Sequence, residues 1–181
     1  MVRILHVLRS INRNQKGFTL IELMIAMAIS GIITGSVTMT IFQVVDSSSR
    51  TSNHMTAVRQ VQSAGYWVSH DALMAQDLVL ADESVDDPDG SRFPFTLTWS
   101  DWTNNEVYTV VYSIVGDELQ RAHSVNSGAA TMGVIAEFID PENTSCQYTG
   151  GTLTFAVTAT VGAGSAAQTE TRTYEIVPRT G

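Results

Sequence analysis

The sequence predicts an α+β protein in which one long N-terminal helix packs on a C-terminal antiparallel β-sheet domain. No proline occurs before Pro88, so a long first segment can stay helical. Apolar or small residues recur at spacings of three and four between Met55 and Val79, as in an amphipathic helix. After Pro94, apolar and polar residues alternate, and this period of two predicts strands.

Composition and charge limit the possible classes of protein. The chain has 181 residues, 44% of them apolar and 15% charged, enough for one folded domain plus an anchor. The net charge of −8 is uneven, because residues 1–17 contain four bases and no acid, while all 18 acids lie further on. An acidic domain repels phosphate backbones, so we expect no direct nucleic-acid partner. Cys146 is the only cysteine, which excludes an intrachain disulfide and leaves its role open.

An uncharged stretch of 23 residues, Leu23 to Val45, follows the basic N-terminus. As a helix it would span roughly 35 Å, against a hydrocarbon core of about 30 Å. The bases before the stretch place the N-terminus in the cytoplasm and the C-terminal domain outside. We therefore expect a single-pass protein of the plasma (inner) membrane, embedded in the lipid bilayer. The four bases are Arg3, Arg9, Arg13 and Lys16.

An acidic residue, Glu22, lies at the start of this apolar stretch, five residues after Gly17. An ionisable group in a spanning segment is costly and usually marks a function. A basic leader, a Gly17-Phe18 junction, the sequence Thr-Leu-Ile-Glu and an apolar helix follow one another in this order. This arrangement resembles the type IV prepilin signature, and the predicted helix-then-sheet architecture is similar to that of pilins.

The resemblance implies that prepilin peptidase removes residues 1–17 by cleaving after Gly17, and that Phe18 is then N-methylated. The new α-amine, with a pKa of about 8, would provide a cation for Glu22; in the family this glutamate is implicated in subunit docking. The implied function is that of a structural subunit, not an enzyme. It would be assembled with other pilin or pseudopilin subunits by an inner-membrane assembly platform, in a type IV pilus or a secretion or competence pseudopilus.

Two further features bear on this interpretation. Asp-Ala-Leu-Met-Ala at residues 71–75, near the expected helix end, resembles the J-type pseudopilins of type II secretion and the related minor pilins. A plain single-span anchor that tethers an extracytoplasmic adhesin or ligand-binding protein stays open as the alternative. It explains the length and orientation of the apolar stretch but not Glu22.

The long helix divides into two halves with different surfaces. Gly31 and Gly35 form a G-x-x-x-G pattern, which favours close helix packing in lipid, although glycine is also simply common in spanning helices. We expect a leader at 1–17, a transmembrane and assembly half at 18–45, an amphipathic soluble half at 46–82 and a β domain at 83–181. Gly65 would weaken the soluble half by about 1 kcal/mol relative to alanine, unless a strand crosses closely there.

The β domain is expected to contain strands over 95–99, 106–114, 118–123, 132–139, 152–160 and 169–177. Short links between them predict an antiparallel sheet. The acidic segment 82–90 does not fit the EF-hand spacing, so a solvated turn is favoured over a calcium site, which stays open. We expect Trp99 in the core, and leave Trp102 open between a turn residue and a ligand contact.

The sequence contains no recognisable catalytic or metal-binding pattern. None of the four histidines has a partner at metal-ligand spacing, so we expect no metal and no cofactor. His70 and Asp71 are expected to lie mostly away from the apolar helix face. As neighbours on a helix they have side chains that leave about 100° apart, so we predict no catalytic pair. The expected function is therefore structural.

Overall fold

The computed structural model describes residues 17–81 and 92–179. Most of the expected leader and the acidic segment 82–90 lie outside the described residues. The chain divides into two compact units, Met1–Asp46 and Ser47–Gly181, and the helix α2 (Leu20–Met74) passes from the first into the second.

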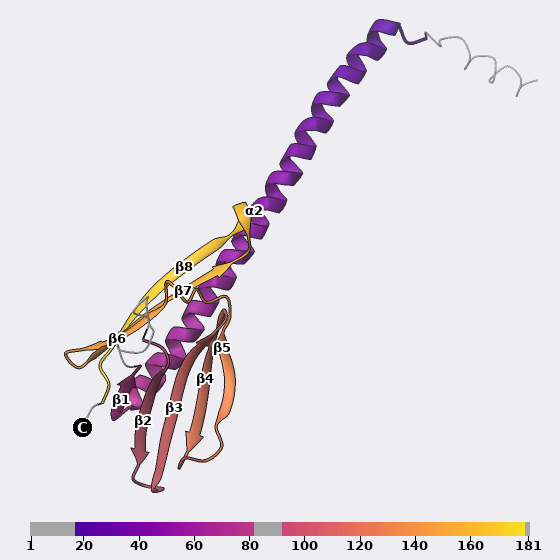
Figure 1. The fold of residues 1–181 in the computed structure, drawn as a ribbon. Coiled ribbons are helices and arrows are strands. Elements are labelled where there is room, and N and C mark those ends of the chain that lie inside the picture. Colours follow the sequence, from indigo (N-terminus) through magenta and orange to yellow (C-terminus); the bar gives the residue numbers. More distant parts are fainter. Residues whose placement is uncertain (1–16, 82–91, 180–181) are drawn as a thin grey trace, which may run out of the picture. The chain divides into compact units, whose positions relative to one another are not determined.

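The second unit contains two antiparallel sheets that lie against the Ser47–Met74 half of α2 (Figure 1). The five-stranded sheet has the order β1-β2-β3-β4-β5, and the three-stranded sheet has the order β6-β7-β8. This confirms the predicted α+β class, with a long apolar N-terminal helix and antiparallel strands behind it. The strands are β1 (Asp77–Leu80), β2 (Phe95–Asp101), β3 (Glu106–Val115), β4 (Glu118–Val125), β5 (Thr131–Ala136), β6 (Ser145–Thr149), β7 (Thr152–Val161) and β8 (Gln168–Ile176), with the short 3₁₀ helix η1 (Gly164–Ala166) before β8.

The helix ends earlier than predicted, so the expectation of a helix to residue 82 is wrong. α2 stops at Met74, and Asp77–Leu80 forms β1, which pairs with β2. The Gln76 N–H already donates to the Thr98 carbonyl at 2.9 Å. Leu78 and Leu80 are the half-buried residues of this strand. The helical spacing of apolar residues continues by coincidence as far as Val79. The segment becomes a strand because it pairs with β2, which lies about twenty residues further along the chain.

Two further differences concern the strands. Ser145–Thr149 forms β6, which was not predicted, and the strands divide into two sheets instead of one. The strand expected over 132–139 ends at Ala136, because Phe138 adopts a left-handed backbone with φ of 59°. Ile139 then forms a single bridge to Ala159 of β7. The chain thus leaves one sheet and reaches the other within three residues.

A stripe of small residues on α2 lets both sheets approach the helix closely. Buried residues from the helix and from each of the strands β2 to β8 form one continuous apolar core. A Cβ added at Gly65 would collide with the ring of Tyr174 of β8, whose hydroxyl donates to the Val61 carbonyl at 3.1 Å. A strand thus crosses closely at Gly65, which is the condition under which glycine is favourable at this helical position. The helical part of the stripe consists of Ala57, Val61, Ala64, Gly65, Val68 and Ala72.

Polar side chains of the helix also reach the sheets. The Asn53 amide donates to the Ala166 carbonyl at 2.8 Å, and the Ser63 hydroxyl donates to the Ile135 carbonyl at 2.7 Å. These carbonyls lie at the end of η1 and on the edge strand β5. They are backbone groups that would otherwise need water or another strand. The helix therefore protects sheet edges as well as closing the core.

Candidate functional site

The first candidate site is the start of α2, where the sequence predicted processing and assembly. Gly17, Phe18 and Thr19 precede the helix, and the Phe18 side chain is 89% exposed. The Glu22 Oε2 atom accepts hydrogen bonds from the backbone N–H and the hydroxyl of Thr19, both at 2.9 Å. The Glu22 N–H in turn donates to the Thr19 hydroxyl at 3.3 Å. This reciprocal arrangement is a capping box, which satisfies backbone donors at the helix start.

The capping box gives Glu22 a local role that our reading of the sequence missed. The signal was present as the Thr19-x-x-Glu22 spacing immediately before an apolar run. Within the described part of the chain, no cation pairs with Glu22, and no hydrogen bond engages its Oε1 atom. One carboxylate oxygen is therefore held by the helix start while the other is available to a further donor.

The segment that follows presents apolar side chains that residues 17–46, the described part of its unit, leave exposed. α2 contains a window long and apolar enough to cross a membrane, and none of that window is buried. The hydroxyls of Ser36, Thr38 and Thr40 each donate to the carbonyl four residues earlier, at 2.8–2.9 Å. Bonded in this way, these polar groups are compatible with a hydrocarbon environment.

Gly31 and Gly35 lie on this segment, in a shallow groove with Ser30, Thr34 and Thr38. A Cβ added at either glycine would meet nothing within 4 Å among the described residues. Packing against the described residues therefore does not require glycine at either position. This contrasts with Gly65, where the close approach of β8 does.

A membrane-capable helix joined to two antiparallel sheets defines an α+β protein whose organisation is consistent with that of pilins. Within this class, residues 12–38 match the model of the prokaryotic N-terminal methylation motif. The chain therefore carries the prepilin-type cleavage and methylation motif of pilin-like proteins, which in general are structural subunits and not enzymes. Comparisons with curated proteins and with solved structures found no match.

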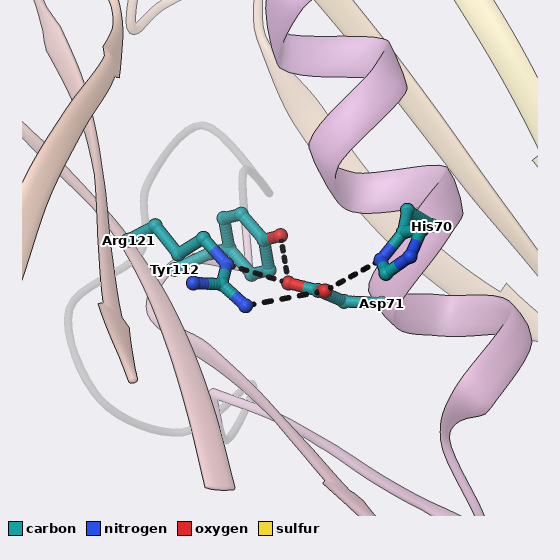
Figure 2. Close-up of polar contacts among 4 residues, drawn as sticks. All are labelled: His70, Asp71, Tyr112 and Arg121. Carbon is teal, nitrogen blue, oxygen red and sulfur yellow. Dashed lines mark hydrogen bonds and ion pairs between the residues drawn. The ribbon is translucent and has the colours of Figure 1, made fainter. Parts of the chain in front are cut away.

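The second candidate site is a buried polar cluster that joins α2 to the five-stranded sheet (Figure 2). Asp71 is only 1% exposed. Its Oδ2 atom accepts hydrogen bonds from the Tyr112 hydroxyl of β3 at 2.5 Å and from Arg121 Nε of β4 at 2.7 Å. Its Oδ1 atom accepts a further bond from Arg121 Nη2 at 3.2 Å. The Arg121 guanidinium also lies 5.1 Å from the ring centre of Trp67.

The ionisation of the cluster follows from these contacts. Burial opposes the charge of Asp71, but hydrogen bonds from Arg121, Tyr112 and His70 outweigh it and hold the pKa of Asp71 below its ordinary value. Burial, followed by the negative charge of Asp71, raises the pKa of Tyr112. Tyr112 therefore stays a neutral donor while Asp71 stays a charged acceptor. The cluster is a fixed clamp between helix and sheet.

Two of the predictions made from the sequence for this cluster are wrong. Asp71 was expected to lie mostly away from the apolar helix face, yet it is buried against the sheet. His70 and Asp71 were expected to point apart, yet His70 Nδ1 lies 3.2 Å from Asp71 Oδ1. The Cα–Cβ bonds of the two residues diverge on the helix, but rotation about the His70 side-chain bonds brings the imidazole back to the Asp71 carboxylate, as Figure 2 shows. Arg121, some fifty residues away, had no signal in the local pattern.

The remaining candidates are placed as follows. Trp99 is partly buried against the core and stacks on Tyr108 with ring centres 5.5 Å apart, whereas Trp102 is 82% exposed. Cys146 is a buried free thiol, and burial raises its pKa to about 12. Within the described ranges, no group of three or more His, Cys, Asp or Glu side chains is arranged to hold a metal ion.

Proposed function

We propose that this protein is a pilin-like structural subunit that prepilin peptidase cleaves between Gly17 and Phe18. Phe18 is then N-methylated, and the subunit enters a type IV pilus or a secretion or competence pseudopilus as a minor component. The observation that carries the proposal is the methylation motif at 12–38, which runs directly into an apolar helical surface that no described residue of its own unit covers. Such a surface needs lipid first and neighbouring helices afterwards.

The geometry at the helix start supports a role for Glu22 in subunit docking. Thr19 occupies one carboxylate oxygen, and the other has no partner in the described chain. Cleavage creates a protonated α-amine on Phe18, which can approach the carboxylate of a neighbouring subunit in a low-dielectric environment. Removing the carboxylate would leave that amine buried without a counter-charge, which is strongly unfavourable. Gly31 and Gly35 are proposed as close-packing points between such helices, because contacts with the described part of their own chain do not require glycine there.

The orientation of the chain in the membrane is inferred from the basic residues that precede the apolar helix. We propose that the basic residues before Gly17 stay in the cytoplasm and that the β domain lies outside, facing the inner-membrane assembly platform until assembly. Protease added to spheroplasts should then degrade the β domain. Protection of the β domain in intact spheroplasts, with degradation only after lysis, would contradict this orientation.

Processing is tested by the intact mass of the protein recovered from membranes. We expect a chain that begins at Phe18 and carries one additional methyl group. Gly17→Val should block cleavage, because a bulky residue replaces glycine at the junction, whereas the matched variant Gly31→Val should be processed normally. A chain that still begins at Met1, in cells with an active prepilin peptidase, would refute the proposal.

The docking role of Glu22 can be separated from its capping role by two variants. Glu22→Gln removes the charge but keeps an oxygen that can accept from the Thr19 N–H, since glutamine also serves in capping boxes. Thr19→Ala removes the side-chain cap, at a cost of about 1 kcal/mol, and keeps the charge. We expect normal helix content and lost filament incorporation for Glu22→Gln, and largely retained incorporation for Thr19→Ala. Normal incorporation of Glu22→Gln would remove the docking role without affecting the processing proposal.

A further inference from the structure

The end of the β2–β3 hairpin contains a polar groove that the assembly proposal does not use. The groove has a volume of about 380 Å³ and opens at the turn between the two strands. Ser100 and Val107 face each other across this end of the hairpin, and Asn126, just after β4, closes one side. Its lining consists of Ser100, Asp101, Trp102, Asn105, Glu106, Val107 and Asn126.

Trp102 is the residue in this groove that folding does not explain. It is 82% exposed, the highest value among the large apolar side chains of the described β domain. The aromatic contacts of Trp99 and Trp67 have no counterpart at Trp102 within the described residues. Turns between strands are usually built from small polar residues, and an indole there buries almost no surface within the chain. An exposed, rigid indole beside a groove is instead suited to contact a ligand.

Several polar groups of the groove are already engaged in holding its shape. Asp101 accepts bonds from the Thr103 N–H and the Asn104 amide, at 2.9 and 2.8 Å. The Asn126 Oδ1 atom accepts from the Val107 N–H at 2.8 Å. Glu106 Oε2 accepts from the Tyr108 hydroxyl at 2.6 Å. These bonds fix the turn and the two walls before any ligand arrives.

The remaining polar groups are both donors and acceptors. In the described part of the chain, no hydrogen bond engages Glu106 Oε1, the Asn126 NH₂ or either end of the Asn105 side chain. The Trp102 N–H adds one more donor. A groove for a cation would present acceptors around the indole, whereas here two amide groups place donors beside one carboxylate oxygen. Sugar hydroxyls, which donate and accept at the same time, match such a mixed set.

We propose that this groove binds a sugar ring of a neutral oligosaccharide, with the apolar face of the ring against the Trp102 indole. Asn105, Asn126 and Glu106 bond the ring hydroxyls, and Val107 provides an apolar floor. Open, partly polar grooves of this size support modest affinity, with a dissociation constant of the order of 1 mM. Binding here is independent of the assembly proposal, because none of the lining residues belongs to α2.

The test uses the full chain in lipid nanodiscs that contain no glycolipid, with ¹⁵N-labelled tryptophan. The three tryptophans give three indole signals, and Trp102→Phe assigns the signal of interest. Maltotriose and N,N′,N″-triacetylchitotriose serve as neutral probes, and tetramethylammonium chloride serves as the cation probe. We expect at least one saccharide to shift the Trp102 signal in a saturable manner, while the signal of Trp67, which does not line the groove, stays in place.

Variants separate a binding groove from a general effect. Trp102→Ala should weaken saccharide binding about tenfold or more, as followed by the methyl signals of Val107, whereas Trp102→Phe should keep most of it. Asn105→Ala should weaken it severalfold, and the rest of the spectrum should be unchanged in all three variants. The proposal is overturned if neither saccharide shifts the signal at about 20 mM. It is also overturned if only tetramethylammonium binds, or if Trp102→Ala binds as tightly as the parent chain.

Discussion

Replacing Asp71 with asparagine is expected to destabilise the β domain by about 3 kcal/mol. The carboxylate accepts two bonds from Arg121 and one from Tyr112, and asparagine can accept at only one oxygen while its NH₂ would face an arginine donor. Hydrogen bonds to charged groups contribute about 1.5–3 kcal/mol each, and breaking a buried ion pair by removing one partner costs about 3–5 kcal/mol. The Arg121 side chain keeps 19% of its solvent exposure, which places the loss at the lower end of that range.

Such a loss is large against a total stability of about 5–15 kcal/mol, and it corresponds to a fall in Tm of about 6–12 °C. The assay is thermal unfolding of the full chain in nanodiscs, followed by tryptophan fluorescence, since the Trp67 ring lies under Arg121. Asp77→Asn is the matched control, because Asp77 is exposed and, among the described residues, its carboxylate accepts only from the adjacent Leu78 N–H. If Asp71→Asn lowers Tm no more than Asp77→Asn does, the clamp does not stabilise the fold.

Three other outcomes follow from the structure. Gly65→Ala should lower the free energy of unfolding by about 1–3 kcal/mol, because the added methyl group meets the Tyr174 ring. Helix propensity alone would raise it by about 1 kcal/mol, so the sign of the change measured by urea unfolding shows which effect is larger. Cys146 should resist iodoacetamide at pH 8 in the folded protein and react rapidly in urea, since burial raises its pKa to about 12; equal rates by mass spectrometry would contradict this. Asp71 has a folded pKa below its unfolded value of about 3.9, so its contribution is complete above that pH and is lost as pH falls through the folded pKa. The urea midpoint should therefore fall less in acid for Asp71→Asn than for the parent chain.

Much of the fold could be predicted from the periodicity of apolar residues. The two strands that were missed, β1 and β6, are too short for periodicity to identify. The long helix, the antiparallel pairing and six of the strands follow from spacings of three to four and of two. β1 was missed because Leu78 and Val79 continue the helical spacing, and only pairing with β2 makes the segment a strand. β6 is five residues long and contains Cys146 and Gln147 between turn residues, so its alternation is too short to recognise.

The two candidate sites differ in how far local sequence predicts them. The processing junction and Glu22 lie within one short stretch, so order and spacing were sufficient, and the capping box was readable from the same residues. The clamp is not readable in this way, because Asp71 meets Arg121 across fifty residues and a helical wheel placed its side chain away from the buried face. Charge pairs between elements depend on sheet register, which local patterns do not determine.

The bonds that hold the second half of α2 have a consequence for the timing of folding. Asn53 bonds Ala166 and Val61 bonds Tyr174, and each pair is separated by 113 residues. At a synthesis rate of about 5–20 residues per second, the helix waits roughly 6–20 s for the strand that closes over Gly65. During that interval the part of the apolar stripe around Val61 and Gly65 lacks the cover that Tyr174 of β8 provides. The nascent protein then depends on the membrane, or on a chaperone on the side where the domain emerges, to keep it from a wrong partner.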